Sequence, residues 1–152
     1  MTYVGQNYGA MRFDRIAAGM KSATVLAVAT AAVIAVLMFV FGRPITMLFI
    51  SAENPADAAQ AGSIAYIYLC VMASCLPVLY ILYLLLFSLQ GLGDAVRPMI
   101  SGGVELALRI GVAAAVVSTG FEMGICGAEI VAWLGSTIYL AYHYRKRMRC
   151  GK

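Results

Sequence analysis

The chain has 152 residues, of which 62% are hydrophobic and only 12% charged, with a mean hydropathy of +0.87 and a formal charge of +4. Soluble domains average about 45–50% apolar and about 25% charged residues, so a water-soluble globule of this length could not bury so much apolar surface. The composition argues against a cytosolic enzyme, a nucleic-acid-binding domain and a disordered chain. It predicts an all-α integral membrane protein.

Residues 1–21 precede the first long apolar run, and they contain Arg12, Asp14 and Arg15. They lack the apolar core of a cleavable signal peptide, so we expect a loop at the membrane surface. The first span follows at about residues 22–42, because a helix needs roughly 20 apolar residues to cross a bilayer. Pro44 is expected to end or kink this helix.

Three further spans are predicted after a polar loop at residues 51–60. The second, at about 64–89, lies in a long uncharged stretch that we interpret as one helix kinked by Pro77, rather than as two short crossings. A turn at residues 90–98 leads to the third span at about 99–118, and the fourth occupies about 123–142. The predicted architecture is a four-helix transmembrane bundle.

The Lys and Arg residues give the predicted orientation. Four crossings place nine of them on the side of both termini and Arg43 alone on the other, which predicts cytoplasmic termini in a plasma membrane, of the bacterial inner-membrane type. The basic tail, residues 145–152, holds five of the eleven Lys and Arg residues. Beside an apolar span, such a tail indicates contact with anionic membrane lipid rather than with nucleic acid.

Small residues recur every fourth position in three spans, and this spacing lets helix backbones approach closely. Any one stripe could arise by chance in an alanine-rich sequence, but three together predict a tightly packed bundle. The stripes are Ala23, Ala27, Ala31 and Ala35; Gly103, Ala107, Gly111 and Ala115; and Gly124, Ala128, Ala132 and Ser136.

Three charged residues lie inside the last two spans. Glu105 and Arg109 are four residues apart and can pair on one helix face, nearly opposite the small-residue stripe. Glu129 has no cation nearby on its own helix. A charge at mid-membrane costs roughly 2.5–3.5 kcal/mol on insertion scales. We therefore interpret the three as candidates for a polar cavity that takes ions, protons or a cationic substrate; the alternative is a structural ion pair plus a carboxyl near the interface.

Two tyrosines are weaker candidates. Tyr80 and Tyr83 lie one turn apart on the second span and could stack on a cationic substrate, although ordinary bundle packing explains them as well. The four cysteines and single histidine lack the spacing of a zinc site. No set of side chains typical of an enzyme is visible. The sequence therefore predicts no catalytic residue, no metal site and no cofactor.

Three motifs are similar to those of the multidrug and toxic compound extrusion (MATE) transporters. Gly5–Arg15 (GQNYGAMRFDR) resembles the loop after the family's eighth helix, and Leu89–Pro98 (LQGLGDAVRP) resembles the loop between its tenth and eleventh. Glu105 to Arg109 followed by Gly124–Trp133 (GICGAEIVAW) resembles its last two helices. The motif residues that we single out in the two loops are Gly5, Gln6, Asn7, Gly9, Gln90, Gly91, Gly93 and Pro98.

The resemblance implies a fold of twelve helices in two lobes, which exports organic, often cationic, compounds in exchange for H⁺ or Na⁺. The chain would be the last four helices of the second lobe, with a helix remnant at Met1–Val4, and its partners would be the missing first lobe, membrane lipid and a small-molecule substrate. The second span lacks the acid that many members carry there, so ion coupling would rest on Glu105 or Glu129. Alternatives are a lipid-linked substrate flippase of the same superfamily, a non-transporting four-helix membrane subunit, and an inactive gene fragment.

Overall fold

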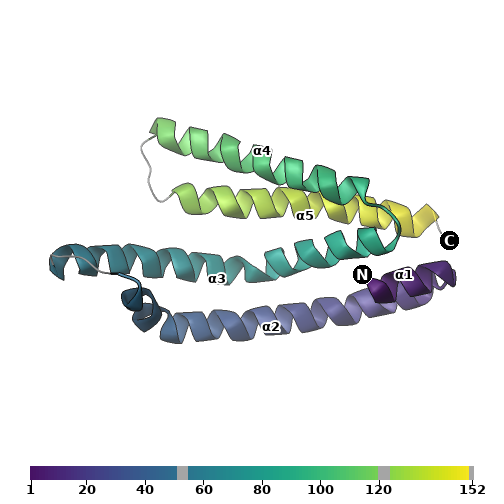
Figure 1. Cartoon of the computed structure of the whole chain (residues 1–152), viewed down its shortest axis with the longest axis horizontal. Coiled ribbons are helices and arrows are strands. Elements are labelled where there is room, and N and C mark those ends of the chain that lie inside the picture. The colour runs from purple at the N-terminus through teal and green to yellow at the C-terminus, as the bar shows by residue number, and fades with distance from the viewer. Residues whose placement is uncertain (51–54, 120–123, 151–152) are drawn as a thin grey trace.

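The computed structural model describes residues 1–50, 55–119 and 124–150, and nearly all of them are helical. Figure 1 shows α4, α5, α3 and α2 side by side in that order, with the short α1 beside the start of α2. No strand occurs in the described part of the chain. The helices are α1 (Thr2–Gly9), α2 (Phe13–Leu48), α3 (Pro55–Gly91), α4 (Val96–Thr119) and α5 (Gly124–Cys150).

Three of these helices, α2, α3 and α4, are long and apolar enough to cross a membrane, judged over the described residues. They cover the first three predicted spans. The fourth span, at about 123–142, falls largely on α5 and stays a prediction, and the exact membrane boundaries do too. An all-helical chain with three such helices is a multi-pass membrane protein.

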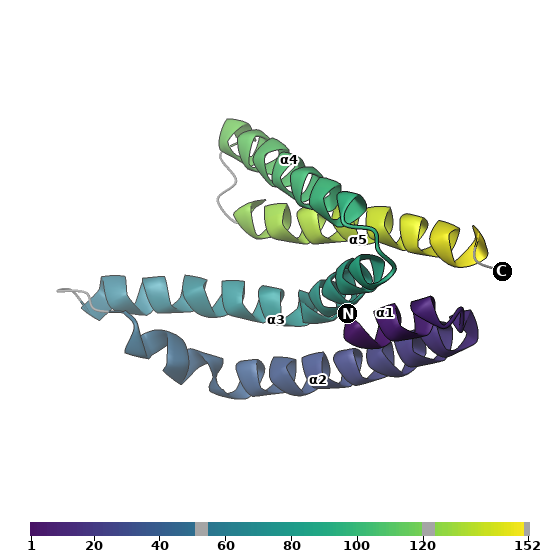
Figure 2. The ribbon, with the colours of Figure 1, turned by 45° about the vertical axis from the view of Figure 1, so that its right-hand side comes forward.

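Two prolines lie inside long helices. Pro44 does not end α2, which continues to Leu48. Pro77 lies inside α3, which is one helix of 37 residues, as the sequence predicted. Figure 2 shows that α3 changes direction about midway along its length. A proline lacks the N–H that would bond one turn back, so it bends a helix where it stands. The predicted loop at 51–60 is only partly tested, because residues 51–54 lie outside the described ranges and α3 already begins at Pro55.

The first 21 residues contain more helix than the expected cytoplasmic loop with a helix remnant. The helix remnant expected at Met1–Val4 extends to Gly9, and α2 begins at Phe13. Phe13 and Ile16 are buried on one side of α2 together with Val4 and Leu92. The charged residues Arg12, Asp14 and Arg15 remain exposed on the other side. This start of α2 is therefore amphipathic, and its charged face hid the helix from a hydropathy argument.

The turn between α1 and α2 closes in the same way as the turn between α3 and α4. After α1, Met11 N–H donates to Tyr8 O and Arg12 N–H donates to Asn7 O. After α3, Gly93 N–H donates to Gln90 O and Asp94 N–H donates to Leu89 O. Both are Schellman motifs, which need a left-handed residue after the helix. Gly93 fills that position with φ +79°, whereas Met11 does so with φ 55°.

Helix α5 lies between α4 and α3 (Figure 1), and two apolar clusters hold this end of the molecule together. Leu82, Leu85 and Leu89 of α3 are buried against Leu140 of α5. The second cluster is the one around Ile16 and Leu92, to which Tyr144 and Met148 of α5 add their side chains. The predicted basic tail is consequently helical as far as Cys150, since Tyr144 and Met148 are one turn apart and pack inward.

The small-residue stripes divide into two kinds. The stripe of α5 packs as predicted: Ala128, Ala132 and Ser136 are buried. The α2 stripe also faces inward, with Ala31 fully buried. The α4 stripe does not, because all four of its residues from Gly103 to Ala115 are exposed in this chain. Helix α4 instead packs through the opposite face, which carries Glu105 and Arg109.

Candidate functional site

The three charged residues that the sequence singled out form one network. Arg109 Nη2 donates to Glu105 Oε1 at 2.9 Å within α4, and to Glu129 Oε2 at 2.7 Å across to α5. The pairing of Glu105 with Arg109 was predicted from their spacing. No cation near Glu129 was predicted on its own helix, and the neighbouring helix supplies Arg109. This partner could have been predicted, because Arg109 is the one cationic residue in the two predicted spans.

This network carries more negative than positive charge. Two carboxylates share one guanidinium, so one negative charge is uncompensated. The side chains are partly covered, with 25% of Glu105, 27% of Glu129 and 40% of Arg109 exposed. Arg109 Nε is buried and has no hydrogen-bond partner among the described residues. Chemically, such an arrangement can take up a proton or a small cation beside the carboxylates.

Helix geometry places the network in the half of the α4–α5 pair that lies away from the C-terminus. At 1.5 Å per residue, Glu129 lies about 8 Å from the start of α5 and Arg109 about 20 Å from the start of α4. The helices are held together nearer the middle by a second polar contact. Ser136, which is fully buried, donates from Oγ to Ser101 O at 3.1 Å. The charged network therefore sits on a pair of helices already fixed side by side.

Tyr80 and Tyr83 do not belong to this network. They line a different cavity of about 290 Å³ between α1, α2 and α3. Tyr83 is half exposed and stacks on Phe87, with 6.0 Å between the ring centroids. Gly19 and Ala23 of α2 line the side of this cavity opposite the two tyrosines. The five residues predicted for one ion and substrate cavity are thus divided between two places.

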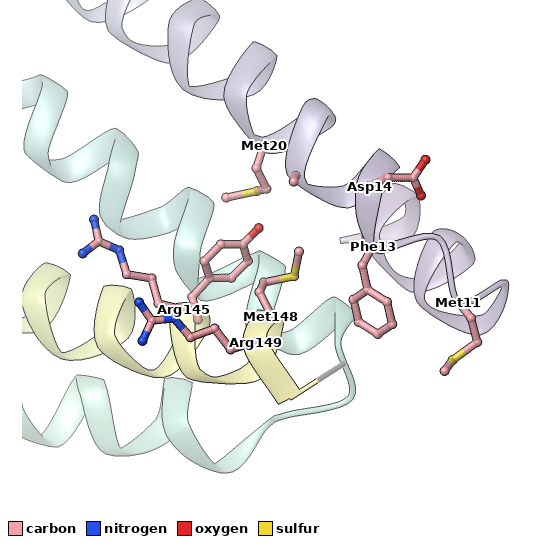
Figure 3. Close-up of a pocket in the computed structure, with 9 residues that line it drawn as sticks. Met11, Phe13, Asp14, Met20, Arg145, Met148 and Arg149 are labelled. Carbon is pink, nitrogen blue, oxygen red and sulfur yellow. The ribbon is translucent and has the colours of Figure 1, made fainter. Parts of the chain in front are cut away.

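A larger cavity of about 600 Å³ lies between the start of α2 and the end of α5. Figure 3 shows Met20 and Met148 extending between the two ribbons, whereas the Asp14 carboxylate points away from them. Thioether side chains adapt to many shapes. This cavity was not predicted from the sequence, because it forms only where two charged, amphipathic helix ends pack against each other.

The two loop motifs meet in space. Gly91, at the end of α3, has no room for a side chain: a Cβ there would lie 2.8 Å from Met1 O and 2.9 Å from Val4 Cβ. A Cβ on Gly5 would lie 3.5 Å from Gly91 O, which is ordinary contact. Gly93 has a positive φ after α3, whereas Gly9 does not, and Met11 takes the corresponding position after α1.

The remaining motif residues have local contacts. Asn7 Nδ2 donates to Tyr3 O at 2.8 Å, the Gln6 carbonyl accepts from Ala10 N–H, and the Gln90 carbonyl accepts from Gly93 N–H. Pro98 is buried in the first turn of α4. These roles are structural, because each contact stays within one turn of its helix or within the adjoining turn. The motifs thus join α1, α3 and the start of α4.

Long apolar helices that pack through small residues and a partly covered charge network define a multi-pass helical membrane protein. A family model described as MatE matches residues 1–119. The chain therefore belongs to the MATE family, which is a family of membrane transporters rather than enzymes. The match covers Glu105 and Arg109 but ends before α5, so Glu129 lies outside it. No curated protein and no solved structure matches the chain.

Proposed function

We propose that this chain is the last part of the second lobe of a MATE-type antiporter, which exports organic, often cationic, compounds in exchange for H⁺ or Na⁺. The observation that carries the proposal is the network of Glu105, Arg109 and Glu129 in a chain of this family. A charged group inside a membrane span is costly unless it is paired or functional. Here one carboxylate remains in excess after pairing, which suits a site that binds and releases a cation.

The network suits coupling because its guanidinium is shared. When a proton or Na⁺ neutralises Glu129, the attraction between Glu129 and Arg109 weakens, and Arg109 remains paired with Glu105 on its own helix. The bond across to α5 is then lost while the bond within α4 persists. Cation binding would in this way change the contact between two helices, which is what an alternating-access lobe requires.

The aromatic cavity beside α3 is the proposed place for the exported compound. Tyr83 presents much of its ring to the outside, and Phe87 extends the aromatic surface. A flat organic cation gains from the face of such a ring by about 0.5–2 kcal/mol. Substrate and coupling ion would therefore occupy separate places, one between α1, α2 and α3 and the other between α4 and α5.

The test uses Trp133, the single tryptophan of the chain, which lies one helical turn after Glu129. In detergent at constant ionic strength, replacing K⁺ by Na⁺, or lowering the pH, should change its fluorescence as the network takes up the cation. Glu129→Gln should abolish this response. In the transporter that contains this segment, the same substitution should reduce gradient-driven export of a cationic dye by at least about tenfold, as expected when an essential ion site is lost.

Asp14→Asn is the matched control, because it also removes one carboxylate that is paired with an arginine. Asp14 pairs with Arg12 at the exposed start of α2. This control should leave both the fluorescence response and the export unchanged. Unaltered export by the Glu129→Gln protein, at equal expression, would remove the network from the coupling mechanism.

A further inference from the structure

A small cavity lined by basic side chains alone lies where the start of α4 meets the end of α5. Its volume is about 160 Å³, and its lining residues are Arg97, His143, Lys146 and Arg147. Pockets for drug-sized ligands begin at about 300 Å³. This cavity is therefore too small for the organic compounds that the family exports, and it is distinct from the network and from the aromatic cavity.

The charge in this cavity is incompletely balanced. Asp94 is the carboxylate that pairs with Arg97, and it also accepts the Arg97 N–H at the start of α4. Three cationic side chains thus face one carboxylate, which leaves two positive charges even when His143 is neutral. The partial positive charge of the α4 N-terminus adds to them.

Two side-chain nitrogens of the lining residues have no hydrogen-bond partner among the described residues. They are His143 Nδ1 and Arg147 Nε, and both are buried. The other end of the Arg147 guanidinium is fixed, since Nη2 donates to Tyr8 Oη at 3.1 Å. Buried polar atoms are nearly always satisfied in native proteins. The two nitrogens thus indicate that the polar groups around this cavity are not fully paired within the described chain.

We propose that Arg97, His143, Lys146 and Arg147 form a binding site for a phosphate group. Several separate donors around one compact anion is the arrangement that phosphate oxygens favour. The phosphate can belong to a phospholipid headgroup or to a soluble phosphate compound. The proposal does not depend on the antiport function, because none of these residues belongs to the Glu105–Arg109–Glu129 network.

The position of the cavity brings a lipid phosphate within reach. Arg97 and His143 lie just outside the predicted third and fourth spans, at the level where headgroups are expected. Lys146 also lines a neighbouring cleft of about 690 Å³, which has Ile138 and Tyr142 on its apolar side. A phospholipid could place its phosphate on the basic residues and an acyl chain along these apolar ones.

His143 is the only histidine in the chain, so its ring signals report on the cavity without ambiguity. Burial lowers the pKa of His143, and the positive charges of Arg97 and Lys146 lower it further, while Asp94 opposes them. The rings of Tyr139 and Tyr142 also contact this histidine. A phosphate bound beside the imidazole would favour its protonated form and raise the pKa of His143.

The experiment follows the His143 ring by NMR in the full chain, kept in dodecyl maltoside micelles, whose headgroup carries no phosphate. One arm adds phosphatidic acid to the micelles, and the other adds inorganic phosphate to the buffer. A rise in the His143 pKa with phosphatidic acid alone assigns the site to a lipid headgroup. A rise with inorganic phosphate assigns it to a soluble phosphate. A pKa that moves in neither arm overturns the proposal.

Lys146→Gln is the diagnostic substitution, since it removes one charge without touching the Asp94–Arg97 pair. This substitution should raise the half-saturating ligand concentration by about tenfold, which is the loss of affinity expected for one charge-assisted hydrogen bond. Arg15→Gln is the matched control: it removes the same charge from the exposed start of α2, and Arg15 lines neither this cavity nor the neighbouring cleft. An equal loss in both variants would mean that the ligand responds to the general surface charge, and it would overturn the site.

Discussion

The two long helix pairs are held together by different chemistry. The α4–α5 pair has a polar interface, with the bond from Ser136 to Ser101 and the bridge from Arg109 to Glu129. The α2–α3 pair has two neutral hydrogen bonds: Tyr66 Oη donates to Phe39 O at 2.8 Å, and Ser88 Oγ donates to Met20 Sδ at 2.7 Å. In both pairs, a glycine of one helix leaves room for a leucine of the other. Gly135 of α5 lies against Leu108 of α4, and Gly42 of α2 lies against Leu69 of α3.

The comparison shows how the chemistry of an interface determines whether the contact between two helices can respond to a change of charge. Lipid tails are as apolar as leucine, so apolar side chains alone give helices little preference for one another in a membrane. An interface with charges is more specific, and its strength depends on the state of the charges. The α4–α5 contact can therefore respond to a cation, whereas the α2–α3 contact has no ion pair among its described residues.

The largest effect should follow from removing the shared cation. Arg109→Gln leaves two carboxylates close together without a partner, and a charged group left unpaired costs about 3 kcal/mol or less at this partial exposure. We expect a lower unfolding midpoint in detergent, measured by circular dichroism. The triple variant that also carries Glu105→Gln and Glu129→Gln should regain most of the loss. A triple variant no more stable than Arg109→Gln alone would contradict the charge explanation.

A somewhat smaller effect should follow from filling the α4–α5 contact. Gly135→Leu forces a side chain into the space of Leu108, and such overpacking costs about 1–3 kcal/mol. Gly111→Leu on the exposed face of α4 is the matched control, because no atom lies within 4 Å of a Cβ there. Thermal unfolding should separate the two variants. Equal midpoints would show that the pair is not closely packed at Gly135.

The α2–α3 pair should lose less when one of its two hydrogen bonds is removed. Tyr66→Phe deletes the hydroxyl that bonds to Phe39 O and keeps the ring, which should cost about 0.5–1.5 kcal/mol. Tyr68→Phe, on the same helix, is the control for loss of a tyrosine hydroxyl. Hydrogen exchange of the α2 and α3 amides would localise the change. An equal loss in both variants would mean that the Tyr66 bond does not stabilise this pair.

The smallest effect concerns the turns that lead into the two pairs. Gly93 is suited to the left-handed position before α4, whereas Met11 pays about 1 kcal/mol for the same position before α2. Met11→Gly should therefore raise the unfolding midpoint slightly. Leu26→Gly, at an exposed position inside the regular helix of α2, should lower it. A fall in both variants would show that the backbone at Met11 is not strained.

The sequence predicted the long helices better than their ends. Apolar length alone locates α2, α3 and α4, because lipid imposes a minimum span. The helix ends could not be located by apolar length. Around Phe13 and Tyr144, one face of the helix is apolar and the other is charged, so the average hydropathy falls although the helix continues. Only the packing partner on the inward face reveals such a segment.

The residues of the candidate site could be predicted from the sequence, but the contacts among them could not. Few charges occur in these spans, so Glu105, Arg109 and Glu129 stand out at once. Which helix faces which depends on the rotation of α4, and the exposed stripe at Gly103 and Gly111 shows that small residues alone did not fix that rotation. Tyr80 and Tyr83 were separated from the charges because they lie on α3, which meets α5 through leucines instead.

The proline within α3 has a mechanical consequence. Helix α2 contacts α3 on both sides of Pro77, through Tyr66 in the first half and through Ser88 in the second, and the second half also contacts α5 through Leu82 and Leu85. A backbone bond is absent where proline stands, so bending there costs less than elsewhere in the helix. A change of angle at this point would therefore require α2 to slide along one half of α3, while the leucines that join α3 to α5 keep their packing.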